Sequence, residues 1–216
     1  MLTEHLRAVS RPMVAEIVAH PFWAGLRDGS LPATALAHFV TQDTAHLLPA
    51  LGRAFARCAA SADVNAHTKR LSECAYATLE SAPRLWAAFD ALAGNFDTGP
   101  LDHEVPANPT TLAYCSFLNA AAATSFTAGI GAVLPMMWFH MDVCEDLARR
   151  YVPGSRYVAW IDVYNPGERA WPAVREFLRM VDEIDTQASE ADRDQLVRSF
   201  SAAARYEWAF ADGASA

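Results

Sequence analysis

The sequence predicts an all-helical bundle, and three observations favour this fold class. Apolar residues recur at three- and four-residue spacing along most of the 216-residue chain, as they do on the buried faces of helices. No run of alternating apolar and polar residues is typical of a β-strand. Hydrophobic residues make up 52% of the chain, enough for a sizeable core at this length. We therefore expect one helical domain over residues 1–216.

Helix-capping and helix-breaking residues divide the first half of the chain. Pro21 and the turn residues Asp28-Gly29 separate a first helix from a second. The second should begin at Pro32, a residue suited to a first helical turn, and bend at Pro49. The expected helices span about 3–19, about 32–61, and a segment that begins near 63 and passes Pro83.

In the second half, segment 94–108 is rich in Gly, Pro and Asp and predicts a loop. Asn108-Pro109 then starts a helix by its cap chemistry. We expect Gly129 and Pro135 to separate that helix from the next. With about seven helices in all, the chain fits a bundle. The helix after that break should end near residue 150. A short helix is expected at about 157–164 and another at about 168–186. The last should begin at a cap formed by Ser189 and Asp192 and end near residue 212.

The composition excludes several classes of protein. A net charge of −8 argues against a nucleic-acid binder, because contacts to phosphates need a basic surface. No uncharged apolar stretch reaches the roughly 18 residues that a membrane span needs. The first residues lack the charged-then-apolar pattern of a signal peptide, so we expect a cytoplasmic protein.

The four cysteines are widely spaced and form no Cys-x-x-Cys pair, so they indicate neither a zinc site nor a redox motif. Each lies among apolar residues, and we interpret all of them as reduced core residues. We expect no metal and no cofactor. The cysteines are Cys58, Cys74, Cys115 and Cys144.

Two carboxyl residues lie on apolar helix faces, where an unpaired charge is costly to bury. By helical spacing Asp43 shares a face with Phe39, His46 and Ala50. Glu207 shares a face with the apolar residues Phe200, Ala203, Ala204 and Ala211. Structural alternatives remain open, since Asp43 can pair with a buried arginine or cap a helix, and Glu207 can pair with Arg205 at the surface.

A phenol and an imidazole lie on two further apolar stripes. Tyr114 heads the stripe that includes Phe117 and Leu118, and His140 lies on the stripe of Met136 and Cys144. A hydrogen-bonded core histidine is the alternative for His140. Tyr114 and Tyr164, each taken alone, are equally compatible with packing.

Six short motifs, in this order along nearly the whole chain, resemble the TenA family, also called thiaminase II. The resemblance implies a haem-oxygenase-like helical fold and a cytoplasmic aminopyrimidine hydrolase of thiamin salvage, usually a homotetramer or dimer. The motifs are His20-Pro21-Phe22 with Gly29-x-Leu31, Phe39-x-x-Gln42-Asp43, Ala113-Tyr114-x-x-Phe117, Leu134-Pro135-x-x-Trp138, Tyr157-x-x-Trp160-Ile161-x-x-Tyr164, and Phe200 with Tyr206-Glu207.

The resemblance also implies roles for single residues. Asp43 corresponds to the acid that holds the amino group and ring nitrogen of the aminopyrimidine. Glu207 corresponds to the acid/base that protonates the leaving group and activates water. Tyr114 and Tyr164 correspond to phenols that orient and stack on the ring. The expected substrate contacts are completed by Phe39, His46, Met136 and His140.

The sequence departs from the family's main branch at its nucleophile. That branch has a cysteine after the Leu-Pro pair, whereas this chain has Met136, whose thioether cannot form the covalent adduct. His140 replaces a usual tyrosine, and Thr44-Ala45 replace aromatic residues beside His46. Cys144 lies about 12 Å along the helix axis from Met136, too far to take over the attack.

The sequence better resembles a second branch that lacks the cysteine and relies on acidic residues, with Glu80 as a candidate second carboxylate. We therefore expect carboxylate-activated hydrolysis of an aminopyrimidine amine or formamide, with weak or no thiaminase activity. Two alternatives stay open. One is a non-catalytic or repurposed binder of a small aromatic ligand. The other is a non-haem iron oxygenase on the same fold, with ligands such as Asp43, His46, His140 and Glu207.

Overall fold

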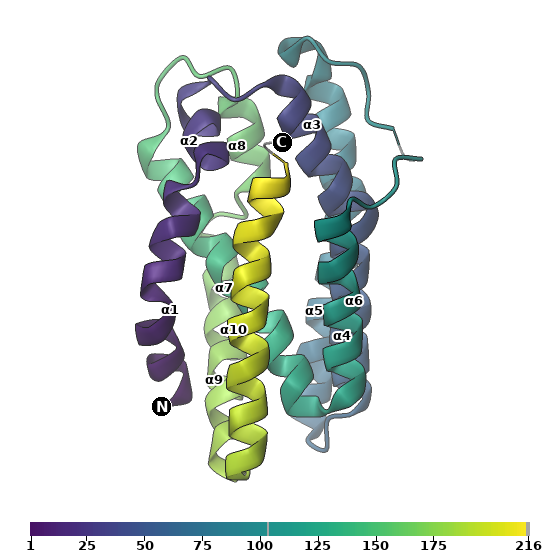
Figure 1. The fold of residues 1–216 in the computed structure, drawn as a ribbon, viewed down its shortest axis with the longest axis vertical. Coiled ribbons are helices and arrows are strands. Elements are labelled where there is room, and N and C mark those ends of the chain that lie inside the picture. Colours follow the sequence, from purple (N-terminus) through teal and green to yellow (C-terminus); the bar gives the residue numbers. More distant parts are fainter. Residues whose placement is uncertain (103, 215–216) are drawn as a thin grey trace.

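The computed structural model describes residues 1–102 and 104–214. Residue 103 of the expected loop and residues 215–216 of the expected domain lie outside the described residues. Within the described part the chain forms ten α-helices and no strand (Figure 1). The all-helical prediction is confirmed. The helices are α1 (Leu2–Ala19), α2 (Pro21–Asp28), α3 (Ala33–Gln42), α4 (Leu48–Ala60), α5 (Asn65–Leu92), α6 (Pro109–Thr124), α7 (Phe126–Arg150), α8 (Val158–Tyr164), α9 (Trp171–Gln187) and α10 (Glu190–Gly213).

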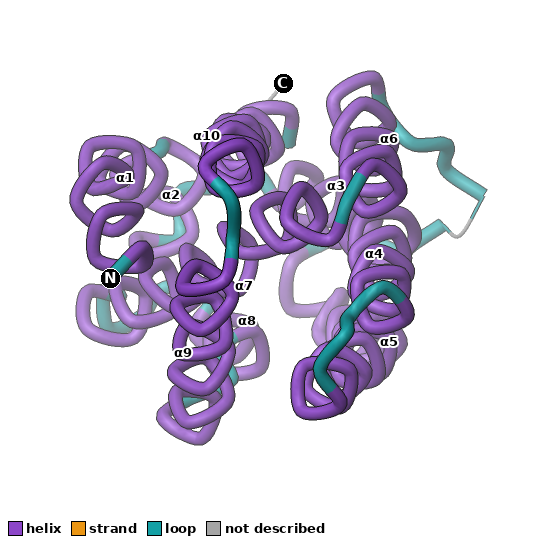
Figure 2. The backbone as a smooth tube through the Cα atoms, turned by 90° about the horizontal axis from the view of Figure 1, so that it is seen from below, coloured by secondary structure: helices purple, strands orange, loops and turns teal. Residues whose placement is uncertain are grey.

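The helices surround one core. In the end-on view of Figure 2, α4, α5 and α6 lie on one side, and α7, α8 and α9 with α1 and α2 lie on the other. Helix α10 packs along α7 for much of its length. Buried apolar side chains from all ten helices join in a single cluster. Two long helical walls therefore face each other across the molecule, and the candidate site lies between them.

Helix α2 was not among the predicted helices. The sequence interpretation placed Pro21 after a helix, but this proline stands in the first turn of a new one, where its missing N–H costs nothing. The Nδ1 atom of His20 caps this helix by accepting a hydrogen bond from the backbone N–H of Phe22, at 3.2 Å. Gly29, at φ 85°, ends it in the left-handed conformation.

The expected break at Gly129 and Pro135 is wrong, because α7 runs through both residues. The chain breaks earlier, at Ser125, whose hydroxyl caps α7 by accepting from the N–H of Ala128 at 3.1 Å. The glycines of α7 serve close packing instead. A Cβ on Gly131 would lie 2.2 Å from the carbonyl oxygen of Leu196 in α10.

The expected kink at Pro49 is replaced by a π-helical turn, Asp43–Leu47, between α3 and α4. Pro49 lies in the first turn of α4, a favourable place for proline. A π turn adds a residue to the helical repeat and often marks a functional site. This one carries Asp43.

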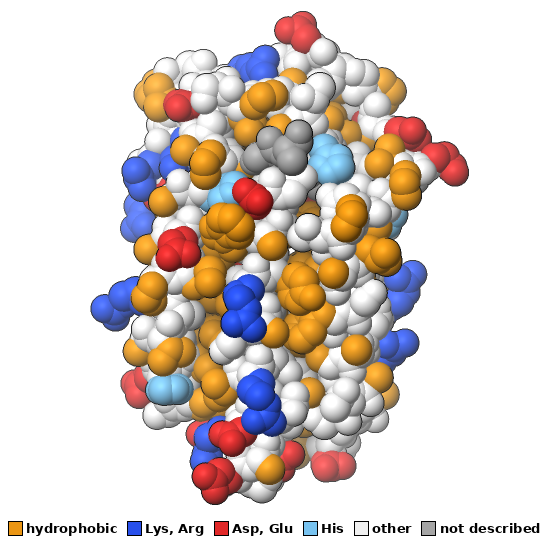
Figure 3. Space-filling view, viewed as in Figure 1, with side chains coloured by type: hydrophobic (Ala, Val, Ile, Leu, Met, Phe, Trp, Pro, Cys, Tyr) orange, Lys and Arg blue, Asp and Glu red, His pale blue; other side chains and the backbone are white. Residues whose placement is uncertain are grey.

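None of the described helices is long and apolar enough to cross a membrane. On the face shown in Figure 3, hydrophobic side chains gather across the middle, over the region of α6 and α10. Leu112 of α6 and Trp208 of α10 are among the exposed large hydrophobic residues. The expected homo-oligomer stays a prediction.

Candidate active site

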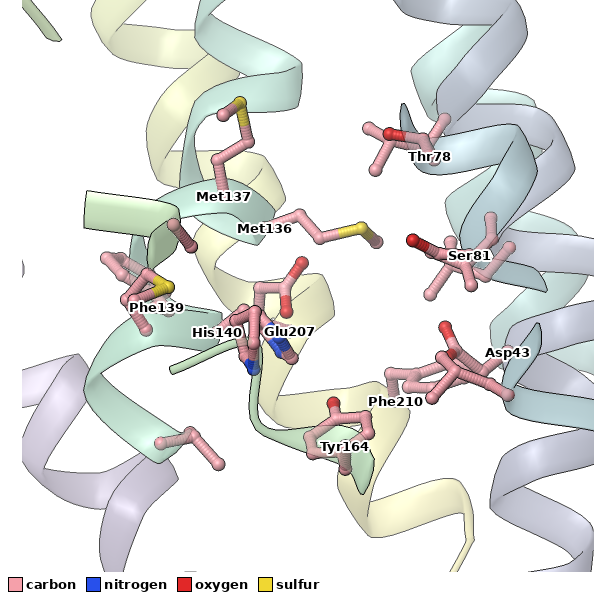
Figure 4. A pocket seen from close by; sticks show the side chains of 18 of the residues that line it. Asp43, Thr78, Ser81, Met136, Met137, Phe139, His140, Tyr164, Glu207 and Phe210 are labelled. Carbon is pink, nitrogen blue, oxygen red and sulfur yellow. The ribbon is translucent and has the colours of Figure 1, made fainter. Parts of the chain in front are cut away.

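A cavity of about 270 Å³ lies between the two walls of the bundle. Helix α5 forms one side and α7 the opposite side, while Tyr164 and Phe210 close one end (Figure 4). Asp43 and Glu207 both line it, although 164 positions separate them in the sequence. The predicted site residues that line the cavity are Phe39, Asp43, Met136, His140, Tyr164 and Glu207.

Asp43 projects from the π turn into this cavity and is only 8% exposed. Burial raises the pKa of its carboxyl to about 7, and the nearby charge of Glu207 adds to the increase. The two alternatives, an arginine partner and a helix cap, are not found for Asp43 among the described residues. Its carboxyl oxygens are therefore available to a ligand.

The π turn also explains why His46 does not line the cavity. On a regular helix both His46 and Leu47 would share a face with Asp43, whereas in the wider π turn Leu47 lines the cavity and His46 does not. The Nε2 atom of His46 lies 2.9 Å from the carbonyl oxygen of Val105, in the loop before α6. Gln42, which precedes Asp43, holds the same loop by two hydrogen bonds, donating to the carbonyl of Pro106 and accepting from the backbone N–H of Asn108. The expectation that His46 contacts substrate is not supported by this geometry.

Glu207 reaches the cavity from a regular stretch of α10, on the face that the apolar residues predicted. The hydroxyl of Tyr114 donates a hydrogen bond to its Oε1 atom. Burial raises the pKa of Glu207 to about 7, while the hydrogen bond from Tyr114 opposes that increase. The surface pair with Arg205 is not formed among the described residues. Both protonation states of Glu207 are consequently accessible near neutral pH.

Tyr114 is fully buried and lies behind Glu207, outside the cavity lining. Its ring stacks on Tyr206, with centroids 5.0 Å apart and planes 8° from parallel. Burial is the main cause that raises the pKa of its phenol well above the ordinary value. Tyr114 therefore stays a hydrogen-bond donor at neutral pH. Because Tyr114 is bonded to Glu207 and does not line the cavity, this geometry does not support the prediction that it stacks on the substrate ring.

His140 and Tyr164 form a polar but uncharged corner of the cavity. Their rings meet edge to face with centroids 4.8 Å apart. Burial, with a smaller contribution from Arg84, lowers the pKa of His140 to about 4, so its imidazole is neutral at physiological pH. Burial raises the pKa of Tyr164 well above its usual range. The Sγ atom of Cys144 lies 3.5 Å from Nε2 of His140.

Met136 occupies the position at which the sequence comparison places a nucleophile. Its thioether extends across the cavity toward Ser81 (Figure 4). No cysteine is among the described residues that line the cavity. Burial raises the thiol pKa to about 12 in Cys58 and to about 11 in Cys74 and Cys115, and raises that of Cys144 further. None of the four is a thiolate at neutral pH, so none is an activated nucleophile.

The α5 wall carries cavity residues that the sequence interpretation missed. Thr78, Ser81 and Arg84 follow one another at three-residue spacing and all line the cavity. Glu80, the candidate second carboxylate, lies on another face of α5, where it is exposed and outside the lining. A polar stripe on a long helix is typical of a solvated face, so only the fold distinguishes these residues from surface ones.

The iron-oxygenase alternative depends on a cluster of nitrogen and carboxylate ligands. His46, one proposed ligand, is directed to Val105 and not to the cavity of Asp43. Across the described residues, no group of three or more His, Cys, Asp and Glu side chains is placed to hold a metal ion.

Fold and cavity together define a helical protein with two carboxyl groups of near-neutral pKa facing one small-molecule site. Residues 7–215 match the model of the TENA/THI-4/PQQC family, and the chain belongs to this family. The resemblance noted in the sequence is thereby confirmed.

Individual relatives agree with this assignment. An aminopyrimidine aminohydrolase of Halalkalibacterium halodurans is 30% identical over 199 residues, which cover 89% of this chain and 86% of the relative. An aminopyrimidine aminohydrolase of Bacillus subtilis is 26% identical over 198 residues, covering 88% and 80%. The structure of a TenA homologue from P. horikoshii OT3 superposes with a TM-score of 0.81 at 25% identity, covering 99% of this chain and 98% of the other.

Proposed function

We propose that this protein hydrolyses a C–N bond of an aminopyrimidine in thiamine salvage, using water activated by a carboxylate and no cysteine nucleophile. The observation that carries the proposal is the pair Asp43 and Glu207, both with a pKa of about 7, in a cavity where Met136 stands at the nucleophile position. The names of two relatives, both aminopyrimidine aminohydrolases, support the substrate class.

Asp43 is the group we assign to substrate binding. A carboxyl group offers an acceptor and, when protonated, a donor on neighbouring oxygens. This pair matches the amino group and adjacent ring nitrogen of an aminopyrimidine. With a pKa of about 7, Asp43 can supply either form at neutral pH. The apolar ring fits beside Phe39, Tyr164 and Phe210, which line the same end of the cavity.

Glu207 is the group we assign to the chemical step. Its carboxylate takes a proton from water as the water oxygen attacks the carbon of the scissile bond. The protonated acid then gives a proton to the departing nitrogen. The C–N bond breaks, a C–O bond forms, and the nitrogen leaves as ammonia; from a formamide substrate, formate is released instead. Tyr114, bonded to Oε1, holds the carboxyl so that Oε2 is left for this work.

The test is Glu207→Gln, measured by ammonia and formate release from aminopyrimidines that carry an amine or a formamide. We expect kcat to fall by about 10²- to 10⁴-fold, the usual contribution of general acid–base catalysis. The Kd for substrate, from calorimetry, should change little. Glu16→Gln, an exposed change on α1, is the matched control. Activity that survives Glu207→Gln would remove Glu207 from this role.

A second candidate function is binding of a small aromatic ligand without turnover. The Met136 thioether in the cavity favours it, because this atom replaces a reactive group with an inert one. Ligand binding by the wild-type protein, with neither ammonia nor formate released, would establish this candidate in place of the hydrolase.

A further inference from the structure

The α5 wall of the cavity carries a positive charge, Arg84. Arg84 lines the cavity one helical turn from Ser81 and two from Thr78. Figure 4 shows the hydroxyl oxygens of Thr78 and Ser81 directed into the space that Met136 enters from the other side. The Ser81 hydroxyl donates to the carbonyl of Ala77 at 2.8 Å, and its oxygen can still accept.

Some arginines of the described chain are paired with carboxylates, and Arg84 is not one of them. Arg7, Arg27 and Arg193 each form an ion pair with an aspartate, namely Asp142, Asp146 and Asp185. Among the described residues no carboxylate pairs with Arg84, and its guanidinium donates one hydrogen bond, to the carbonyl of Val163 at 3.3 Å. Several guanidinium donors therefore remain for a ligand.

The same cavity holds both a cation and carboxyl groups. Arg84 is the only Lys or Arg among its described lining residues. Its charge acts on His140, where it helps to lower the imidazole pKa. The charge of Glu207 acts on Asp43, where it helps to raise the carboxyl pKa. A ligand bound in this cavity can meet both carboxyl oxygens and a cation that no carboxylate of the described residues pairs with.

We propose that Arg84 is a subsite for an anionic oxygen group, a phosphate monoester or a carboxylate, carried by the aminopyrimidine substrate. A guanidinium fork matches both groups with paired hydrogen bonds. The inference rests on the proposed function and narrows its substrate class from neutral aminopyrimidines to those with an acidic substituent. Because Arg84 is exposed, the gain in affinity is modest and sensitive to salt.

The experiment is calorimetric titration of the full-length Glu207→Gln protein, which binds without turnover, in a phosphate-free buffer of low ionic strength. Three ligands share the aminopyrimidine ring and carry a hydroxymethyl, a phosphate monoester or a carboxylate substituent. We expect at least one anionic ligand to bind about 3- to 10-fold more tightly than the neutral one. Added salt should reduce this preference.

Arg84→Gln, added to the Glu207→Gln protein, should abolish the preference for the anionic ligand and leave the Kd of the neutral ligand unchanged. Arg84→Lys, which keeps the charge without the fork, should retain part of it. Arg53→Gln, an exposed change on α4 outside the cavity lining, should leave it intact. Thermal melts check that each variant is folded.

Two results would overturn the inference about Arg84 and leave the proposed function standing. One is equal affinity for all three ligands in the Glu207→Gln protein, and the other is a preference that persists in the Arg84→Gln variant. Loss of neutral-ligand binding on Arg84→Gln would assign Arg84 a structural role instead. If none of the ligands binds before Arg84 is changed, the proposed function fails, and this inference fails with it.

Discussion

The two carboxyl groups of the cavity are held by different kinds of backbone. Glu207 stands on a regular stretch of α10, with Tyr114 hydrogen-bonded behind it. Asp43 stands on a π turn, and no side chain of the described residues pairs with it. Burial nevertheless brings the pKa of both groups to about 7.

This difference indicates a division of labour. A fixed acid on a regular helix, aligned by a phenol, suits a proton transfer that needs constant geometry. An acid without protein partners suits ligand binding, because its hydrogen-bonding capacity is not already used. The turn that presents Asp43 is fastened from outside by the contacts of Gln42 and His46 to the loop before α6.

Replacing Asp43 should cause the larger loss of binding. Asp43→Ala removes the hydrogen bonds to the aminopyrimidine, and we expect Kd to rise by about 10- to 100-fold. Calorimetry checks this value, with Asp63→Ala, an exposed change before α5, as the control. Unchanged affinity would mean that the substrate is held elsewhere, and the proposed division between Asp43 and Glu207 would not stand.

Tyr114→Phe should have a smaller effect on rate and a distinctive effect on pH dependence. The hydrogen bond from Tyr114 stabilises the Glu207 carboxylate and opposes the rise in its pKa. Without this bond, the pKa of Glu207 should increase above about 7, and the corresponding limb of the kcat/KM profile should move to higher pH. We expect kcat to fall by about 5- to 10-fold, the effect of losing one aligned hydrogen bond.

Tyr206→Phe is the matched control for that change. Tyr206 stacks on Tyr114, and no described group hydrogen-bonds its hydroxyl. A profile that shifts equally in both variants, or in neither, would argue that Tyr114 supports packing and not Glu207.

His46→Ala should have the smallest effect on the site. His46 contacts the loop carbonyl of Val105 and does not line the cavity. We expect kcat and Kd to change by no more than about 2-fold, and the free energy of unfolding to fall by about 0.5–1.5 kcal/mol. Activity assays and thermal melts check these values. A large rise in Kd with an unchanged melting temperature would return His46 to the substrate site.

The sequence predicts those parts of the molecule that follow regular helical spacing. Glu207 lies on the face that its apolar neighbours indicate, and the caps at Asn108 and Ser189 begin the helices expected there. The prediction that His46 lies in the site does not match this geometry, because single-sequence periodicity assumes a regular helix and a π turn follows Asp43.

Long-range contacts explain the remaining differences. Gly129 resembles a helix breaker in the sequence, yet it allows close approach of Cys58 and Ala122 from neighbouring helices. In the sequence Tyr114 resembles a residue that stacks on substrate. In the fold, α10 places Glu207 against its hydroxyl. The sequence interpretation missed Thr78, Ser81 and Arg84 of α5, because helix spacing alone does not distinguish a cavity wall from a solvated face.

Intact-protein mass spectrometry tests most directly whether hydrolysis here proceeds without a covalent bond to the protein. The Glu207→Gln variant, which should hydrolyse any covalent intermediate slowly, is incubated with substrate and quenched in acid. Glu207→Gln combined with Met136→Cys, which places a thiol at the position of the thioether, is the comparison for adduct formation. We predict that the Glu207→Gln protein keeps its unmodified mass. A mass increased by the pyrimidine fragment in that protein would contradict the account.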